Sequence, residues 1–139
     1  MNDIISNKVQ SIQRCVFRAR EEYSFNPAGF AFDFSRQDAA LLNVLRACEQ
    51  AIDLANHLIR REKLGIPNSS RESFLLLRDR GIISAELADS LIRMAHFRNL
   101  LVHQYEKMDI DVVCNVIKKK MDDLVRFGDV VMDAVSDTN

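Results

Sequence analysis

Side chains able to bind phosphate, move protons or accept a covalent group gather in one run of eight residues. The run reads Arg98-Asn99-Leu100-Leu101-Val102-His103-Gln104-Tyr105. An arginine stays charged and presents a planar fork to phosphate oxygens. An imidazole titrates near neutral pH and can act as a general acid or base, and a phenol oxygen can carry a covalent tag. Arg98, His103 and Tyr105 are therefore the candidate functional residues.

The run belongs to an expected helix whose stripe residues recur in alternating steps of four and three, the pattern of one buried or partner-facing stripe. The stripe comprises Leu87, Leu91, Met94, Arg98, Leu101 and Tyr105. Arg98 thus takes a position where an aliphatic residue is expected. Because an unpaired buried charge is costly, Arg98 needs an anion, a carboxylate or a path to solvent.

A neighbouring face of the same helix carries the other candidates. Asn99 and His103 are four residues apart and share that face. Arg98 and His103 are five residues apart, which is about 140° around a straight helix. They can converge only if the helix bends or ends, or if a second copy of the chain supplies one of them. The spacing is therefore a hint of a homodimer.

Length and composition favour one helical domain. The 139 residues suffice for a single core, so we expect one domain over 1–139 with a frayed tail from about residue 136. Hydrophobic residues make up 47% of the chain, and only 4 glycines and 2 prolines occur, which favours an all-α protein. The formal net charge is −1, so RNA binding would need a local patch rather than an overall field.

The cysteines and the start of the chain bear on the compartment. No signal-peptide pattern follows Met1, and no apolar run is long enough to span a bilayer. The three cysteines, Cys15, Cys48 and Cys114, are scattered without Cys-x-x-Cys spacing. Such a set fits reduced core thiols in a cytoplasmic protein better than disulfides or zinc ligands.

Periodicity and capping residues predict an up-and-down bundle of about five helices. The expected ranges are 3–23, 36–63, a short helix that starts after Ser69, 84–106, and a fifth helix that starts after Asp109. The second helix is apolar around much of its circumference and should be central, with Ser35 as its N-cap. In the fifth helix the apolar stripe is ambiguous: it runs through Val116 or Ile117, then through Met121 or Lys120.

Three acid–base side chains share one face of the second helix. Glu49, Asp53 and His57 follow one another in steps of four. Two carboxylates and a histidine amount to half of a metal site, but no matching set elsewhere in the sequence completes it. The favoured interpretation is that they pair with arginines, Arg98 among them, or orient the site.

Two further groups allow a functional and a structural interpretation. Four phenylalanines, Phe25, Phe30, Phe32 and Phe34, surround a turn and either stack nucleic-acid bases or, as we favour, pin the loop onto the core. The lysines 118–120 form either a phosphate-binding patch or, as we favour, a solvated face balanced by Asp122 and Asp123.

The sequence carries no glycine-rich phosphate loop, no Gly-x-Ser-x-Gly elbow and no His-Glu-x-x-His motif. The run from Arg98 to Tyr105 resembles the sequence motif of the HEPN domains. In that motif an arginine is followed after four to six residues by a histidine, and a tyrosine often lies two residues after the histidine. Within them the chain resembles the HepT-type toxins that pair with MNT-type nucleotidyltransferase antitoxins. The second helix around 48–57, the break at 64–67 and the segment 70–74 fit the family as well.

The resemblance implies a homodimer joined through the motif helices, and RNA cleavage without metal or cofactor by attack of a 2′-hydroxyl on the adjacent phosphate. In that scheme His103 is the general acid or base, Arg98 binds the scissile phosphate, and Asn99 positions His103 or the phosphate. Tyr105 is the residue to which the antitoxin attaches AMP. The secondary orienting roles expected for Glu49 and Asp53 rest instead on their spacing along the second helix.

The expected partners are therefore the nucleotidyltransferase antitoxin, a tRNA or mRNA substrate and a second copy of the chain, with neither DNA nor a membrane. The alternative is a helical subunit that binds a nucleotide or a nucleotidyltransferase without catalysing a reaction.

Overall fold

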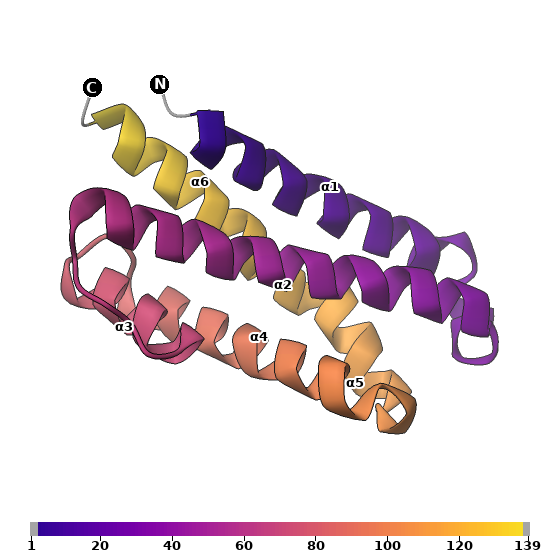
Figure 1. The fold of residues 1–139 in the computed structure, drawn as a ribbon. Helices are drawn as coiled ribbons and strands as arrows, with labels where there is room; N and C mark the ends of the chain where they lie inside the picture. Colours follow the sequence, from indigo (N-terminus) through magenta and orange to yellow (C-terminus); the bar gives the residue numbers. More distant parts are fainter. Residues whose placement is uncertain (1–2, 138–139) are drawn as a thin grey trace.

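The computed structural model describes residues 3–137, and over these residues the chain is helical, without strands (Figure 1). The α-helices are α1 (Asp3–Phe25), α2 (Phe34–Glu62), α3 (Ser70–Asp79), α4 (Ala85–Gln104), α5 (Ile110–Asn115) and α6 (Met121–Asp137). Two 3₁₀ segments, η1 (Pro27–Phe32) and η2 (Tyr105–Lys107), and a π-turn, η3 (Val116–Lys120), complete the described chain. The prediction of an all-α, up-and-down bundle is confirmed.

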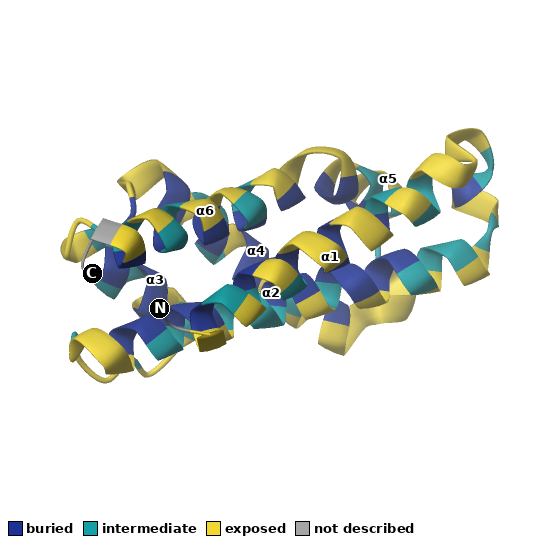
Figure 2. Cartoon of the chain, turned by 90° about the horizontal axis from the view of Figure 1, so that it is seen from above, coloured by how far each residue is buried: buried dark blue, intermediate teal, exposed yellow. Residues whose placement is uncertain are grey.

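The longest helix, α2, is the centre of the bundle, as its apolar circumference predicted. It packs against α1, α3, α4 and α6, and it lies between α1 and α4 in Figure 1. Val44, Leu54 and Ala55 of α2 are fully buried. Figure 2 shows that α1 and α6 alternate buried and exposed residues, as helices with one covered face do.

The start of α2 differs from the prediction. Asp33, and not Ser35, is the N-cap: its side chain accepts a hydrogen bond from the backbone N–H of Arg36 at 3.1 Å. Ser35 already lies inside the first turn, where its hydroxyl has no free helical N–H to cap. The predicted caps of the later helices are confirmed, because Ser69, Ser84 and Asp109 accept from the backbone N–H of Glu72, Leu87 and Asp111 respectively.

The predicted fifth helix is interrupted by the π-turn η3, which explains the ambiguous stripe. Both Val116 and Ile117 are buried because the wider turn accommodates one more residue per turn than the α-helix around it. Beyond the turn Met121 is fully buried and Lys120 is exposed. The helix continues through Asp137, and residues 138–139, which belong to the predicted frayed tail, lie outside the described part.

The prediction that four phenylalanines pin the first loop is wrong for three of them. Phe30 is buried and meets Tyr23 edge to face, with 5.2 Å between ring centroids. Phe25, Phe32 and Phe34 are 68%, 84% and 73% exposed. The short 3₁₀ segment and the cap at Asp33 turn the chain so that one ring points inward and the next two point outward.

The lysines 118–120 are exposed, as expected for a solvated face. The prediction that Asp122 and Asp123 balance their charges is wrong. Asp122 pairs with Arg20 at 2.7 Å, and Asp123 lies 3.9 Å from Arg126. The lysines form no ion pair within residues 3–137. The cysteines fit the expected core thiols at Cys15 and Cys48, which are buried and unpaired by disulfides, whereas Cys114 is half-buried.

Candidate active site on α4

The apolar stripe of α4 anchors the motif on the bundle. Leu87, Leu91, Met94 and Leu101 are buried as predicted, and the helix packs on α2, α3 and α6. The stripe therefore fixes the rotation of α4, and with it the directions in which Arg98, Asn99 and His103 leave the helix.

Arg98 occupies its seam position by reaching across to α2. One terminal nitrogen, Nη2, lies 3.2 Å from Oε2 of Glu49, and the other, Nη1, donates to Oδ1 of Asn99 at 3.1 Å. The side chain remains 32% exposed, so the charge keeps a path to solvent. Its Nε is buried and has no hydrogen-bond partner within the described chain. Arg98 is thus held by an acid on one side and retains unused donor capacity.

Glu49 pairs with Arg98, as the favoured interpretation predicted, whereas Asp53 lies next to a lysine instead. Asp53 faces α1, with its Oδ2 3.9 Å from Nζ of Lys8. Each step of four residues turns about 40° around a helix, so the face drifts from α4 toward α1. The pKa of His57 is lowered by burial and by the positive charges of Arg60, Lys8 and Arg61. Residues 3–137 contain no group of three or more side chains arranged to hold a metal ion.

A buried thiol lies next to the guanidinium. Burial raises the pKa of Cys48 to about 12, and the nearby charge of Arg98 opposes that rise only in part. Cys48 is 1% exposed. It therefore stays a protonated, unreactive thiol that supplies apolar packing beneath Arg98.

His103 and Asn99 lie on the exposed face of α4, one turn apart, as their spacing predicted. Within residues 3–137 the imidazole has neither a hydrogen-bond nor an ion-pair partner. Arg98 is bound toward α2 and makes no contact with His103 in the same chain. Because α4 stays helical through Gln104, a single chain does not bring the guanidinium and the imidazole together.

Tyr105 lies outside α4, so its predicted place on the helical stripe of Arg98 is wrong. The helix ends at Gln104, whose φ of −134° and ψ of 29° leave the helical region, and Tyr105 begins the 3₁₀ turn η2. The chain turns here because Asp109 caps the next helix only a few residues later. Tyr105 is 41% exposed, and its hydroxyl has no partner within the described chain.

Sequence reasoning missed two residues on the open face of α4. His96 lies three residues before Asn99 and seven before His103, so it shares their face, and Arg93 lies one turn further back. Both are exposed and line a cavity that Asn99 also lines. The signal was available in the same steps of three and four that identified the buried stripe.

A family model described as "Ribonuclease HepT-like" matches residues 12–131. The chain belongs to this family. The resemblance to HEPN domains of the HepT type is therefore confirmed. The match spans α4 and both ends of the motif, so the site described above lies within the family's domain.

Named relatives agree with the family. The chain is 43% identical over 131 residues to an mRNA nuclease HepT of Shewanella oneidensis, covering 94% of this chain and 98% of the relative. A solved structure of a tri-AMPylated Shewanella oneidensis HEPN toxin in complex with an MNT antitoxin matches with a TM-score of 0.90 and 42% identity. That match covers 96% of this chain and 99% of the toxin.

A more distant structure shows the fold alone. The cytosolic protein YutE of Bacillus subtilis matches with a TM-score of 0.72 at 16% identity, over 93% of this chain and 91% of its own. Within the described residues, none of the helices combines the length and apolar character that crossing a membrane requires.

Proposed function

We propose that this protein is the ribonuclease toxin of a toxin–antitoxin pair, which cleaves RNA without a metal ion and is switched off by AMP transfer to Tyr105. The observation that carries the proposal is the open end of α4. The imidazole of His103 faces solvent without a partner within the described chain, Asn99 is exposed beside it and accepts a hydrogen bond from Arg98, and Arg98 is anchored by Glu49 with donor capacity to spare. Membership of a ribonuclease family and the likeness to an mRNA nuclease HepT support it.

The chemistry needs one proton acceptor, one proton donor and a fixed positive charge. An imidazole takes the proton of the 2′-hydroxyl, the 2′-oxygen attacks the adjacent phosphorus, and the bond from phosphorus to the 5′-oxygen breaks. The leaving 5′-oxygen takes a proton from a second acid, so the products are a 2′,3′-cyclic phosphate and a 5′-hydroxyl. The guanidinium of Arg98 stabilises the charge that grows on the phosphate oxygens, usually the largest catalytic contribution in such sites.

This scheme favours a homodimer joined through α4. One chain carries His103 as the single histidine of the motif and holds Arg98 on a different side of the helix. Two copies with facing α4 helices would supply two imidazoles and two guanidinium groups to one cleft. The acid and the base would then come from different protomers, with Asn99 of each helix beside its own His103 and Glu49 as the orienting acid for Arg98.

Tyr105 suits a covalent switch because it is exposed on a short turn directly after the motif helix. Transfer of AMP to its hydroxyl would add a negative phosphate and a bulky nucleoside beside the site, which opposes binding of an RNA phosphate. We propose a nucleotidyltransferase antitoxin as the donor enzyme, because the similar Shewanella oneidensis toxin is AMPylated and bound to an MNT antitoxin. An RNA substrate and a cytoplasmic location belong to the same proposal.

The test is cleavage of tRNA and mRNA by the purified protein in the presence of EDTA. Wild type, His103→Ala and Tyr105→Phe are compared, and the intact mass of each is measured. We expect the wild type or Tyr105→Phe to leave cyclic-phosphate ends while His103→Ala leaves the RNA intact. Tyr105→Phe serves as a matched control, since it cannot be purified in an AMPylated, inactive form.

Three results would contradict the ribonuclease proposal or one part of it. If unmodified wild type and Tyr105→Phe both left the RNA intact, the ribonuclease proposal would fail, and a non-catalytic subunit that binds a nucleotide or a nucleotidyltransferase would replace it. Cleavage that His103→Ala retained would remove His103 from the mechanism. Cleavage abolished by EDTA and restored by a divalent cation would contradict the metal-free scheme.

A further inference from the structure

A cavity of about 580 Å³ opens between the start of α3 and the exposed face of α4. It is lined by Ser69, Ser70, Arg71, Ile92, Arg93, Ala95, His96, Phe97, Asn99 and Leu100. One wall is therefore the helix that carries the motif, and Asn99 belongs both to the motif and to the cavity. The cavity extends from the candidate active site back along α4 toward Arg93.

The charges on its wall are all of one sign. No aspartate or glutamate appears among the described residues that line it. Arg71 is exposed and has no ion-pair partner within residues 3–137, and Arg93 donates to Oγ of Ser90 at 3.3 Å but pairs with no carboxylate. Arg20, Arg36 and Arg98, by contrast, each pair with an acid. Arg71 and Arg93 are thus uncompensated cations at the rim of one cavity.

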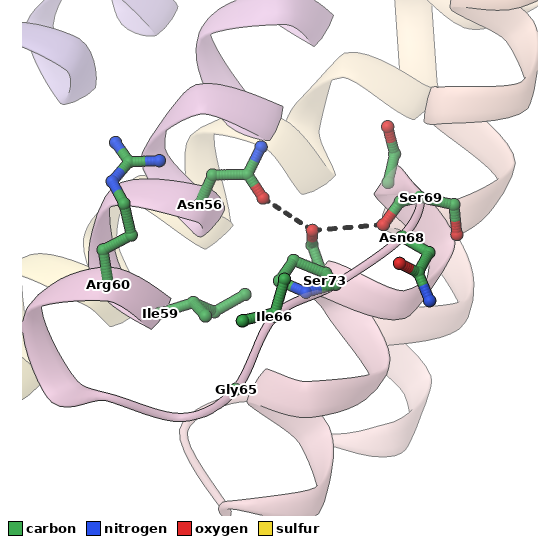
Figure 3. A pocket seen from close by; sticks show the side chains of 10 residues that line it. Asn56, Ile59, Arg60, Gly65, Ile66, Asn68, Ser69 and Ser73 are labelled. Carbon is green, nitrogen blue, oxygen red and sulfur yellow. Dashed lines mark hydrogen bonds between the residues drawn. The ribbon is translucent and has the colours of Figure 1, made fainter.

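Four of the other lining residues are apolar. Ile92 and Leu100 are half-buried side chains of α4, and Phe97 and Ala95 lie deeper. An apolar part of the wall beside two arginines that lack ion-pair partners matches a nucleotide, which offers an anionic phosphate and a base with a large nonpolar face. In the separate cavity of Figure 3, by contrast, the hydroxyl of Ser73 is already hydrogen-bonded to Asn56 and to the backbone oxygen of Ser69.

We propose that this cavity is a subsite for one nucleotide of the RNA substrate, next to the scissile phosphate. Arg71 and Arg93 bind a phosphate of that nucleotide, and Leu100 with Ile92 supports its base. The subsite rests on the proposed ribonuclease function and explains how a chain with a net charge of −1 holds RNA through a local patch.

The experiment measures RNA binding in a chain that cannot cleave. In the His103→Ala background, the double variant Arg71→Ala/Arg93→Ala is compared with Arg14→Ala/Arg18→Ala, which removes the same charge from exposed arginines of α1. The probe is a short fluorescein-labelled single-stranded RNA, read by anisotropy over a series of salt concentrations. Each lost phosphate contact reduces the slope of log Kd against log salt by about 0.7 for a single strand.

We expect the cavity double variant to bind on the order of tenfold more weakly and to lose about 0.7 of that slope, because the two arginines bind one phosphate. The α1 double variant should match the parent. A third variant, Leu100→Ser, separates the base from the phosphate: it should weaken binding several-fold and leave the salt slope unchanged, because it removes an apolar contact and no charge.

Two results would overturn the subsite while leaving the ribonuclease proposal in place. One is an unchanged Kd and salt slope in the cavity double variant while wild type cleaves RNA. The other is a change in molar mass in solution caused by the cavity substitutions, with RNA binding lost only in proportion, which would make the cavity a contact between copies. A wild type that neither binds nor cleaves RNA would overturn both proposals together.

Discussion

Two polar clusters of this bundle differ in how completely their groups are satisfied. Between α2 and α3, the hydroxyl of Ser73 donates to Oδ1 of Asn56 at 2.6 Å and lies 3.2 Å from the backbone oxygen of Ser69 (Figure 3). Ser73 is 1% exposed. At the end of α4, by contrast, the side chains of His103 and Tyr105 are exposed and have no partners in the described chain, and Arg98 keeps a buried, unpaired Nε.

The difference separates a structural role from a chemical one. A closed network gains stability only while each buried group keeps its partner. A site must leave donors and acceptors open for its substrate, so it contributes little to the folding free energy. Substitutions at the first cluster should therefore change stability without changing the cleavage rate, and substitutions at the second should do the reverse.

The largest effect should come from Arg98. Arg98→Ala should lower RNA cleavage by about 100- to 1000-fold, the loss typical when a donor to developing negative charge is removed. Arg98→Lys should recover little, because an ammonium group lacks the planar fork. Initial rates and thermal unfolding are measured together. Arg126→Ala, which removes another partly exposed, ion-paired arginine, is the control. Arg98→Ala with near-normal cleavage would place the motif arginine outside the chemistry.

The closed cluster should respond in the opposite way. Ser73→Ala leaves Oδ1 of Asn56 without its donor, so we expect a loss of about 1–3 kcal/mol in the free energy of unfolding. The cleavage rate per folded molecule should stay at the wild-type level. Ser35→Ala, at the exposed serine that does not cap α2, should leave both quantities unchanged in urea titrations and rate assays. Lost activity in a folded Ser73→Ala protein would contradict the division between the clusters.

Glu49 links the open site to the core, and its effect should be intermediate. Glu49→Ala frees the guanidinium of Arg98, so we expect a several-fold lower kcat with little change in stability, because the ion pair is partly exposed. Glu49→Gln keeps a hydrogen-bond acceptor at the same place and should restore most of kcat. Equal losses in the two variants would show that charge, rather than position, is what Glu49 supplies.

The smallest effect concerns the pH dependence of stability, and it distinguishes His57, which lies away from the motif, from His103, which belongs to it. The pKa of His57 is lowered below 6.5 by burial and nearby cations. As pH falls through 6.5, the unfolded chain therefore binds a proton before the folded chain does, and stability declines until the lower folded pKa is passed. His57→Gln should flatten this decline in unfolding experiments between pH 7 and pH 5 and leave the pH–rate profile of cleavage unchanged. A shifted pH–rate profile would instead connect His57 to the site.

Local patterns predicted the helices well because burial and capping act over a few residues. The stripe of α4, the central place of α2 and the caps at Ser69 and Ser84 follow from periodicity and side-chain type. The exposure of Phe32 and the end of α4 before Tyr105 do not, because they depend on how the chain turns in three dimensions.

The site itself was predictable in part. The residues of the motif and the pairing of Arg98 with Glu49 were expected from the sequence, since a seam arginine needs an acid. The cavity beside Asn99 was not, because Arg71 comes from α3 and joins the α4 residues only through the tertiary packing of those helices.

The π-turn at Val116–Lys120 contains one extra residue, and that residue sets the orientation of the segment before it, which includes α5 and the η2 loop. Successive residues of an α-helix are about 100° apart, so deleting one residue from the turn would rotate α5 by that angle relative to α6. The cap at Asp109 and the η2 loop that carries Tyr105 would swing with it. Deleting one residue more than ten positions away would thus redirect the tyrosine, although no residue of the motif itself had changed.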